Sequence, residues 1–332
     1  MLSTAISHPN KAIVIYWGNT DDSLNIPSRT SLSMTLRGLN HKLDYIVTLK
    51  TAQDAQRDRV IIDGSEDKGE IYKDFVRHLD IMRQCTRIKE KLIVTTSKTF
   101  PVGSGLAGSA AAASALAEAF AGLVDGGMDK KRVSIMARRG SGSAARSVFS
   151  GFVKLQTGTA EESFAVQLHD EKHWDLCDVI AIVDPGMKKV KSREGMRLSK
   201  RTCPKDVYSN FVGMAEDHVR RAARAVTIRD LEGLGKVYEA DNMLFRTVCM
   251  KTKPPLDYWA GATDEVFAAV TWLRSEGVPA FAGTDAGPNV HILTGSRHAR
   301  KVIEKVKEVA RVNEVIHAIP GEGSRRLRKH LL

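Results

Sequence analysis

A run of small residues at positions 101–111, PVGSGLAGSAA, is suited to binding an anion. Glycines let backbone N–H groups turn toward one point, and the start of the following helix adds a positive dipole end. The residues that would form this phosphate loop are Gly103, Ser104, Gly105, Gly108 and Ser109. The run lacks both the Lys-Ser/Thr ending of a Walker loop and dinucleotide spacing, so an ordinary strand-to-helix turn explains it equally well.

A second run of small residues, RRGSGSAARS at 138–147, contains an arginine close to its end. Small side chains let hydroxyl groups and backbone approach a ligand. The guanidinium of Arg146 offers a planar fork that matches a carboxylate or a phosphate. Taken alone, the run is more simply a tight connection between helices with one solvated arginine.

An aspartate stands among small residues in a third segment, GTDAGPN at 283–289. If Asp285 is held against a bound substrate, its carboxylate can act as a base or as an electrostatic element. Asp, Gly, Pro and Asn also make plain turns through local hydrogen bonds from side chain to backbone. Without further context, the turn is the simpler interpretation.

Composition narrows the classes of partner. The net charge of +11 favours anionic partners, but the basic residues are dispersed and aromatic residues make up only 6%, which argues against nucleic acid. Ten histidines and four widely separated cysteines show no metal-ligand spacing, so we predict no metal site. The longest apolar stretch, Ala110–Val124, is too short and too mild to span a membrane, so we expect a cytoplasmic protein with no membrane partner.

The hydrophobic pattern alternates between strands and helices without repeats or a linker, which predicts an α+β fold. Three helices are expected in the second half, near Val207–Val226, Ile228–Met250 and Thr263–Glu276. Composition changes smoothly near residue 185. We therefore expect two lobes that share an interface, residues 1–184 and 185–332, rather than two tethered domains.

Several short segments, in one chain order, resemble those of the diphosphomevalonate decarboxylases of the GHMP superfamily. They are Asn10–Lys11–Ala12 with Tyr16–Trp17–Gly18, Ile26–Pro27 with residues 30–36, then 101–111, 140–147 with 151–154, 192–196, Pro254–Pro255 and 285–289. Several motifs in the family's own order are far more specific than any one of them, and they extend from about residue 10 to residue 293.

This resemblance implies a fold and a reaction. The fold is GHMP kinase-like, with an N-terminal S5-like lobe, a C-terminal ferredoxin-like lobe and a cleft between them. In the family's reaction ATP phosphorylates the tertiary hydroxyl of mevalonate diphosphate, the phosphate leaves, and carbon dioxide is lost as an alkene forms.

The resemblance also implies roles for individual residues. Arg146 would hold the substrate carboxylate, and Asp285 would lie at the tertiary oxygen. The residues that would bind the distal phosphate or diphosphate are Tyr16, Ser141, Ser143, Ser192 and Arg193, with Lys73 at the place of a phosphate-binding arginine.

Three positions depart from the family pattern. The lysine before Tyr-Trp-Gly is Ile15 here, the lysine after it is Asn19, and the first of two serines in the phosphate loop is Gly108. Because these positions support phosphoryl transfer, we predict that the kinase step is altered while decarboxylation is kept. Other cations could replace the missing charge, and the candidates are Lys11, Lys98 and Arg29.

The preferred prediction is an enzyme that decarboxylates mevalonate 3,5-bisphosphate to isopentenyl phosphate without ATP or another cofactor. An ATP- and Mg²⁺-dependent decarboxylase of mevalonate diphosphate or monophosphate is the first alternative. A mevalonate kinase that does not decarboxylate and a basic nucleic-acid-binding protein are the others. We expect the partners to be a small phosphorylated substrate and a second copy of the chain, as a homodimer.

Overall fold

The computed structural model describes residues 1–100, 108–184, 186 and 189–331. Strands β1 to β11 are β1 (Leu2–Ser7), β2 (Asn10–Val14), β3 (Asn19–Asp21), β4 (Ile26–Pro27), β5 (Ser31–Gly38), β6 (Tyr45–Ala52), β7 (Arg59–Ile62), β8 (Ser65–Asp67), β9 (Lys91–Lys98), β10 (Phe152–Leu155) and β11 (Ala165–His169). Strands β12 to β16 are β12 (Leu176–Ile182), β13 (Ala280–Thr284), β14 (Val290–Gly295), β15 (Glu314–Pro320) and β16 (Arg325–Leu327). The helices are α1 (Glu70–Gln84), α2 (Gly108–Ala121), α3 (Lys130–Gly140), α4 (Ala144–Ser147), α5 (Ser192–Thr202), α6 (Lys205–Gly213), α7 (Ala215–Ile228), α8 (Leu231–Lys251), α9 (Gly261–Ser275) and α10 (Ser296–Lys307).

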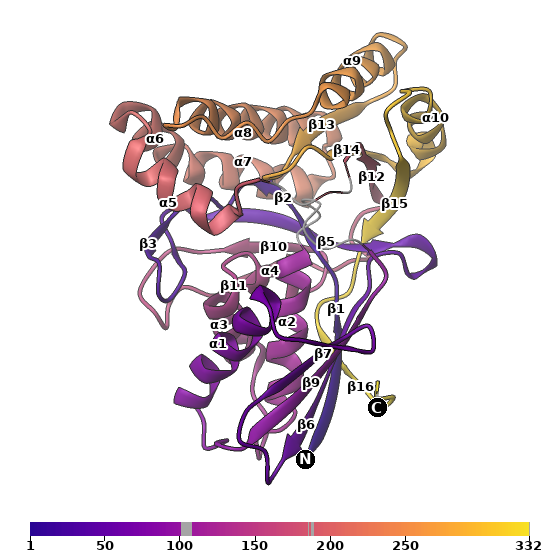
Figure 1. Ribbon diagram of the computed structural model, residues 1–332. Helices are drawn as coiled ribbons and strands as arrows, with labels where there is room; N and C mark the ends of the chain where they lie inside the picture. Colours follow the sequence, from indigo (N-terminus) through magenta and orange to yellow (C-terminus); the bar gives the residue numbers. More distant parts are fainter. Residues whose placement is uncertain (101–107, 185, 187–188, 332) are drawn as a thin grey trace.

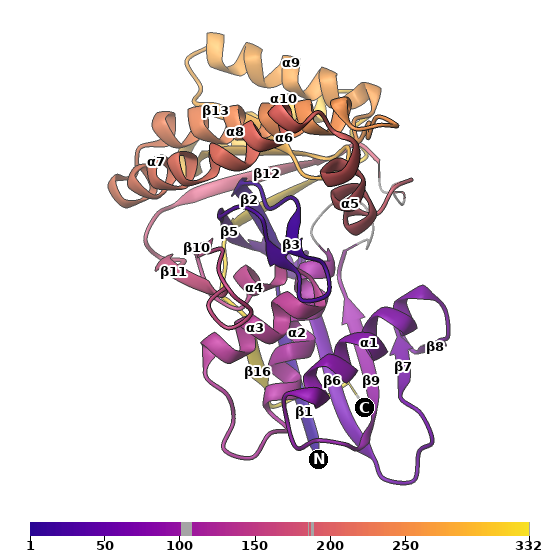
Figure 2. The same ribbon diagram turned by 90° about the vertical axis from the view of Figure 1, so that its left-hand side faces the viewer.

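One sheet forms the base of the N-terminal lobe. Its strand order is β16-β1-β6-β9-β7-β8; helices α1 and α2 lie against one face of it, and α3 packs on these two helices (Figures 1 and 2). Helix α2 is buried on almost every side because it lies between this sheet and α3. Its run of alanines explains how it fits, since a helix without long side chains can approach its neighbours closely.

A larger sheet runs through the middle of the molecule. Its order is β11-β10-β5-β15-β12-β14-β13, with β2 also paired to β5. Helices α8, α9 and α10 pack on its C-terminal strands, and α7 lies beside α8 against β2 and β5 (Figure 1). Strand β12 is buried along its whole length, as expected for a strand covered on both faces.

The two halves of the chain are interleaved at this sheet. Strand β15 pairs with both β12 and β5, and β16 then pairs with β1 of the other sheet. The two-lobed α+β architecture predicted from the sequence is confirmed. The exact division into residues 1–184 and 185–332 stays a prediction.

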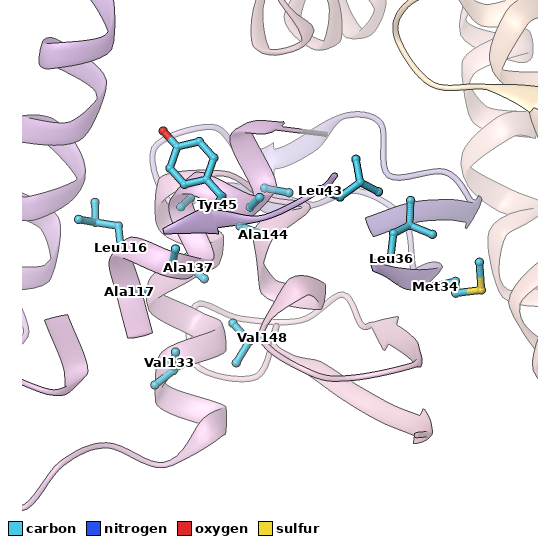
Figure 3. Close-up of a cluster of buried hydrophobic side chains, with 14 of the residues drawn as sticks. Met34, Leu36, Leu43, Tyr45, Leu116, Ala117, Val133, Ala137, Ala144 and Val148 are labelled. Atoms are coloured by element: carbon cyan, nitrogen blue, oxygen red, sulfur yellow. The ribbon is translucent and has the colours of Figure 1, made fainter. Parts of the chain in front are cut away.

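A shared hydrophobic cluster holds α2, α3 and α4 against β5 and β6 (Figure 3). Its labelled members are Met34, Leu36, Leu43, Tyr45, Leu116, Ala117, Val133, Ala137, Ala144 and Val148. The short helix α4, which carries Arg146, is therefore fixed from both sides by packing rather than by its own length.

Two details of the helices follow local chemistry. The helix predicted near residues 207–226 is two helices, α6 and α7, and α6 ends at Gly213, a residue type that weakens helices. Helix α8 begins where the side chain of Asp230 accepts a hydrogen bond from the Gly233 N–H, as an N-cap.

Within the described part of the chain, no helix is both long and apolar enough to cross a bilayer.

Candidate active site

Strand β2 and the turn after β13 bring a lysine and an aspartate together across the molecule. The Nζ of Lys11 lies 2.7 Å from Oδ1 of Asp285, with the lysine side chain fully buried and the aspartate one-fifth exposed. A buried ammonium group is tolerated only when it is paired, so this contact is a strong constraint on both residues. Burial raises the pKa of Asp285. The neighbouring Lys11, His291 and Arg146 lower it by more than burial raises it, so the pKa lies below its ordinary value. The aspartate is thus ionised at neutral pH.

Arg146 is held in a fixed orientation beside this pair. Its Nε donates to Ser33 Oγ at 2.8 Å, Nη1 donates to Ser31 Oγ at 2.5 Å, and Nη2 donates to Asn10 Oδ1 at 3.0 Å. Burial lowers the pKa of Arg146 to about 10, against the opposing effects of Asp285 and Tyr16. A guanidinium carries five N–H groups, so among contacts to described residues one N–H on each outer nitrogen remains for a bidentate ligand.

The Tyr16 side chain lies at the other end of the site. Its hydroxyl donates to Asn19 Oδ1, and a Cβ added at Gly142 would overlap its ring, so the glycine is needed for this close approach. Burial raises the pKa of Tyr16 well above its ordinary value, while the charges of Arg146, Arg138 and Arg193 partly offset this. The hydroxyl is therefore protonated at neutral pH, and its single O–H is donated to Asn19.

Two guanidinium groups meet at the end of α3. Arg193 Nη2 donates to the Gly140 carbonyl oxygen at 3.0 Å, and Arg77 Nη2 approaches the same oxygen at 3.5 Å. Burial and then the nearby charge of Arg77 lower the pKa of Arg193. Two like charges this close favour an anion between or beside them.

The predicted serines line the same region. Ser141 is the C-cap residue of α3, and its Oγ lies 3.5 Å from Ser109 Oγ at the start of α2. Ser143 accepts a hydrogen bond from Asn10 Nδ2 through its carbonyl oxygen at 3.1 Å. Ser192 is the first residue of α5, whose N-terminus carries Arg193. The structure thus brings Tyr16, Ser141, Ser143 and Arg193 toward one another from three segments of the chain.

Part of the predicted phosphate loop lies outside the described residues, namely Gly103, Ser104 and Gly105. Gly108 is the buried first residue of α2, and Ser109 follows it at the surface.

Lys73 does not join the group. It is exposed on α1, where its Nζ pairs with Glu70 at 3.1 Å. Arg77, one turn further along the same helix, reaches Gly140 instead. The sequence comparison missed Arg77 because the alignment is loose there. A basic residue four positions on, on the same side of the helix, was the available signal.

The departures from the family pattern have different surroundings. Ile15 packs in an apolar cluster with Trp17 and Phe245, and its N–H donates to Asp241 Oδ2 at 2.7 Å. The Asn19 side chain accepts a hydrogen bond from the Tyr16 hydroxyl and donates one to Asp22. Neither position supplies a cation.

Only one of the three cations considered as a replacement lies at Asp285. Arg29 is buried against Asp241 at 2.7 Å, and Lys98 pairs with Asp63 at 3.3 Å. Lys11 of β2 is the one of these three that pairs with Asp285.

Among the residues that the structure describes, no three His, Cys, Asp or Glu side chains gather as a metal cluster. A Mg²⁺ ion coordinated mainly by phosphate oxygens and water needs no such cluster of side chains.

We expect Arg77→Ala to raise KM for the phosphorylated substrate about tenfold with little change in kcat, because a charge-assisted contact to a distal phosphate acts equally before and during reaction. The matched control is Lys73→Ala on the same helix, which should leave KM within about twofold, since exposed ion pairs contribute little. Steady-state kinetics on both variants measures these KM values. A larger rise in KM for Lys73→Ala than for Arg77→Ala would show that Lys73 is the phosphate contact.

Comparisons with known proteins cover nearly the whole chain. Residues 7–165 match the profile of the diphosphomevalonate decarboxylase-like N-terminal domain, and residues 178–328 match that of the mevalonate 5-diphosphate decarboxylase C-terminal domain. The human diphosphomevalonate decarboxylase is 31% identical over 310 residues, covering 88% of this chain and 76% of the relative. The Candida albicans diphosphomevalonate decarboxylase is 28% identical over 319 residues, and the match covers 91% of this chain and 87% of the relative.

Solved structures agree with the sequence matches. Mevalonate diphosphate decarboxylase from Staphylococcus aureus superposes with a TM-score of 0.92 at 29% identity, covering 99% of both chains. MDDEF in complex with MVAPP, AMPPCP and magnesium gives a TM-score of 0.91 at 27% identity, also over 99% of both chains. Because family profiles match both the N-terminal and the C-terminal part, and the human relative is 31% identical over 88% of the chain, this chain belongs to the diphosphomevalonate decarboxylase family of carboxy-lyases.

Proposed function

We propose that this protein decarboxylates a phosphorylated mevalonate through an intermediate that carries phosphate on its tertiary oxygen. The observation that carries the proposal is the buried Lys11–Asp285 pair beside the fixed fork of Arg146. One end of this arrangement suits a hydroxyl that must lose a proton, and the other suits a carboxylate.

The reaction makes two demands that these residues can meet. The C–O bond to the phosphate breaks with its electron pair, which leaves positive charge on the tertiary carbon. The C–C bond to the carboxylate then breaks, its pair forms the alkene, and carbon dioxide departs. Arg146 would orient the carboxylate, and the negative charge of Asp285 would stabilise the cationic carbon.

The distal phosphate would bind at the opposite end. Its proposed contacts are Tyr16, Ser141, Ser143, Ser192, Arg193 and Arg77. A phosphate fixed there sets the distance to Asp285, so that remote binding energy is used to align the reacting carbon.

We propose that ATP, with Mg²⁺, supplies the tertiary phosphate from mevalonate diphosphate. Support comes from the relatives, which include an Enterococcus faecalis enzyme whose structure concerns mevalonate diphosphate-mediated ATP binding. Lys11 adds support from this chain itself, because it restores a cation at Asp285 that Ile15 does not provide. Both observations favour this alternative over the ATP-independent reaction expected from the sequence.

ATP-independent decarboxylation of mevalonate 3,5-bisphosphate is the second candidate. It is favoured by Ile15 and Asn19, which carry no charge and are engaged by neighbours of their own. Such a substrate already carries the leaving phosphate, so it needs no phosphoryl-transfer groups.

One assay separates these reactions. Purified protein is mixed with mevalonate diphosphate, the 5-monophosphate or the 3,5-bisphosphate, each with and without ATP and Mg²⁺, while carbon dioxide and ADP are measured. We expect carbon dioxide from mevalonate diphosphate at least about a hundredfold faster with ATP, with one ADP per carbon dioxide. Carbon dioxide from the bisphosphate without nucleotide would establish the second candidate instead. ADP without carbon dioxide would identify a kinase, and no reaction in any mixture would refute the proposed function.

Family membership supports a small phosphorylated substrate rather than nucleic acid. The homodimer and the cytoplasmic location stay predictions from the sequence, to be checked by size-exclusion chromatography with light scattering and by fractionation of cells.

A further inference from the structure

An amide and a carboxylate link the hydroxyl group of Tyr16 to helix α5. The side chain of Asn19 accepts a hydrogen bond from the Tyr16 hydroxyl through Oδ1, and its Nδ2 donates one to Asp22 Oδ1 at 3.1 Å. The other carboxylate oxygen of Asp22 accepts a hydrogen bond at 3.2 Å from Nε of Arg197, which lies on α5. A continuous chain of hydrogen bonds therefore runs from a proposed phosphate contact to a helix of the second half of the chain.

The direction of these hydrogen bonds is fixed by the carboxylate of Asp22. A carboxylate paired with a guanidinium accepts hydrogen bonds, so the amide of Asn19 must turn its Nδ2 to Asp22 and its Oδ1 to Tyr16. Asn19 is only 1% exposed, and the reversed amide would leave buried polar atoms unmatched. The hydroxyl group of Tyr16 is thereby held in one place.

Two further contacts fasten the same segment to α5. Lys200 Nζ donates to the main-chain carbonyl oxygen of Asn19 at 2.7 Å. The indole Nε1 of Trp17 donates to Ser199 Oγ at 3.1 Å, and both of these side chains are buried. The link to α5 therefore does not depend on one exposed ion pair, which by itself would contribute little.

Helix α5 also carries a proposed phosphate contact in its first turn. Arg193 precedes Arg197 by four positions, so the two residues lie on one side of the helix. Arg193 Nη2 donates to the Gly140 carbonyl oxygen at 3.0 Å, directly before the glycine and serine segment of the site. Holding Arg197 at Asp22 therefore also limits how far Arg193 can move from Tyr16.

The hairpin of β3 and β4 has other contacts that maintain its own shape. Asp21 Oδ1 accepts a hydrogen bond from the Ser23 N–H at 2.8 Å, which closes the turn. Asn25 Nδ2 donates to the carbonyl oxygens of Arg138 and Arg139, which fastens the hairpin to the end of α3. The amide–carboxylate link is not part of this turn. It extends out of the hairpin on both sides, toward the site and toward α5.

We propose that Asn19 and Asp22 are positioning residues that hold Tyr16 and α5 at a fixed separation on the two sides of the distal phosphate. Neither residue touches the reacting atoms, and both act through Tyr16 and Arg193. Asn19 stands where the family has a lysine, so this chain uses the position for a neutral link instead of a cation. The inference rests on the proposed function, which assigns the distal phosphate to Tyr16 and Arg193.

The kinetic test compares Asn19→Leu and Asp22→Ala with the control Thr20→Val. Leucine keeps the volume of the asparagine but breaks both side-chain hydrogen bonds, whereas Thr20 is an exposed residue of the same hairpin whose hydroxyl donates to the Ile26 carbonyl oxygen. Each site variant should lower kcat about tenfold with KM within about threefold, because a displaced phosphate misaligns the reacting carbon. The double variant should be no slower than the slower single variant, since both changes break one link. The control should keep the wild-type kcat and KM.

Hydrogen exchange measured by mass spectrometry tests the link without any substrate. The backbone amides of α5 should exchange about fivefold faster in both site variants than in the wild type, the effect of losing one or two hydrogen bonds that hold the helix. Thr20→Val should leave this exchange unchanged. The side chain of Asp22 is 37% exposed, so Asp22→Ala decides the question if Asn19→Leu does not fold.

Three results would overturn the proposal. Unchanged exchange in α5 would show that the link does not hold the helix, whether or not the proposed reaction is correct. Faster exchange together with the wild-type kcat would show a merely structural role. A lower KM with an unchanged kcat in Asn19→Leu would show that Asn19 only competes with the substrate for the hydroxyl group of Tyr16.

Discussion

Asp285→Asn is expected to lower kcat by about a thousandfold or more while the protein stays folded. The amide keeps the size and can still accept a hydrogen bond from Lys11, but it can neither take a proton nor supply negative charge to a cationic carbon. The measurement is carbon dioxide release at saturating substrate, with circular dichroism and thermal unfolding to establish folding.

A matched control exists close to Asp285. Asp257 is exposed and accepts a hydrogen bond from the Trp259 N–H, and Asp257→Asn should leave kcat within about twofold. If Asp285→Asn decarboxylates at the wild-type rate, Asp285 is only a turn residue and the proposed site is wrong.

Lys11→Met should be almost as damaging, with kcat reduced about a hundredfold to a thousandfold. The methionine fills the buried volume but leaves Asp285 without its 2.7 Å partner and removes a cation from the place where phosphoryl charge develops. Because Lys11 is the largest influence lowering the pKa of Asp285, its removal raises that pKa, and the acid limb of the remaining activity moves to higher pH. Loss of a partner from a buried pair also costs about 3–5 kcal/mol of stability, which thermal unfolding will report.

Lys98→Met is the control for this experiment, since Lys98 pairs with Asp63 and not with Asp285. It should change neither kcat nor the pH profile. Wild-type kinetics in a folded Lys11→Met protein would mean that some other group balances Asp285, and the argument that Lys11 replaces the charge missing at Ile15 would fail.

The local motifs were readable from the sequence because short-range chemistry determines them. Glycine and serine between residues 140 and 147 permit a tight turn and close approach, as the contact of Tyr16 with Gly142 illustrates. The aspartate after β13 likewise sits in a turn that its Gly-Pro neighbours favour. The order of these motifs along the chain was sufficient to predict the fold and the family.

Contacts between distant segments could be decided only by the tertiary structure. Lys11 and Asp285 are 274 positions apart, and nothing in either motif shows that β2 and the end of β13 meet. The choice of Arg77 over Lys73 depends on where α1 lies beside the end of α3, a distance of one helical turn. Asp178 of β12 and His291 of β14 are paired at 2.6 Å only in this strand register, because a slip of one strand by one residue would place one of the two side chains on the opposite face. Sequence motifs thus determined which kind of chemistry to expect, whereas register and packing between the lobes determined which charges meet, because those contacts form only when the whole chain has folded.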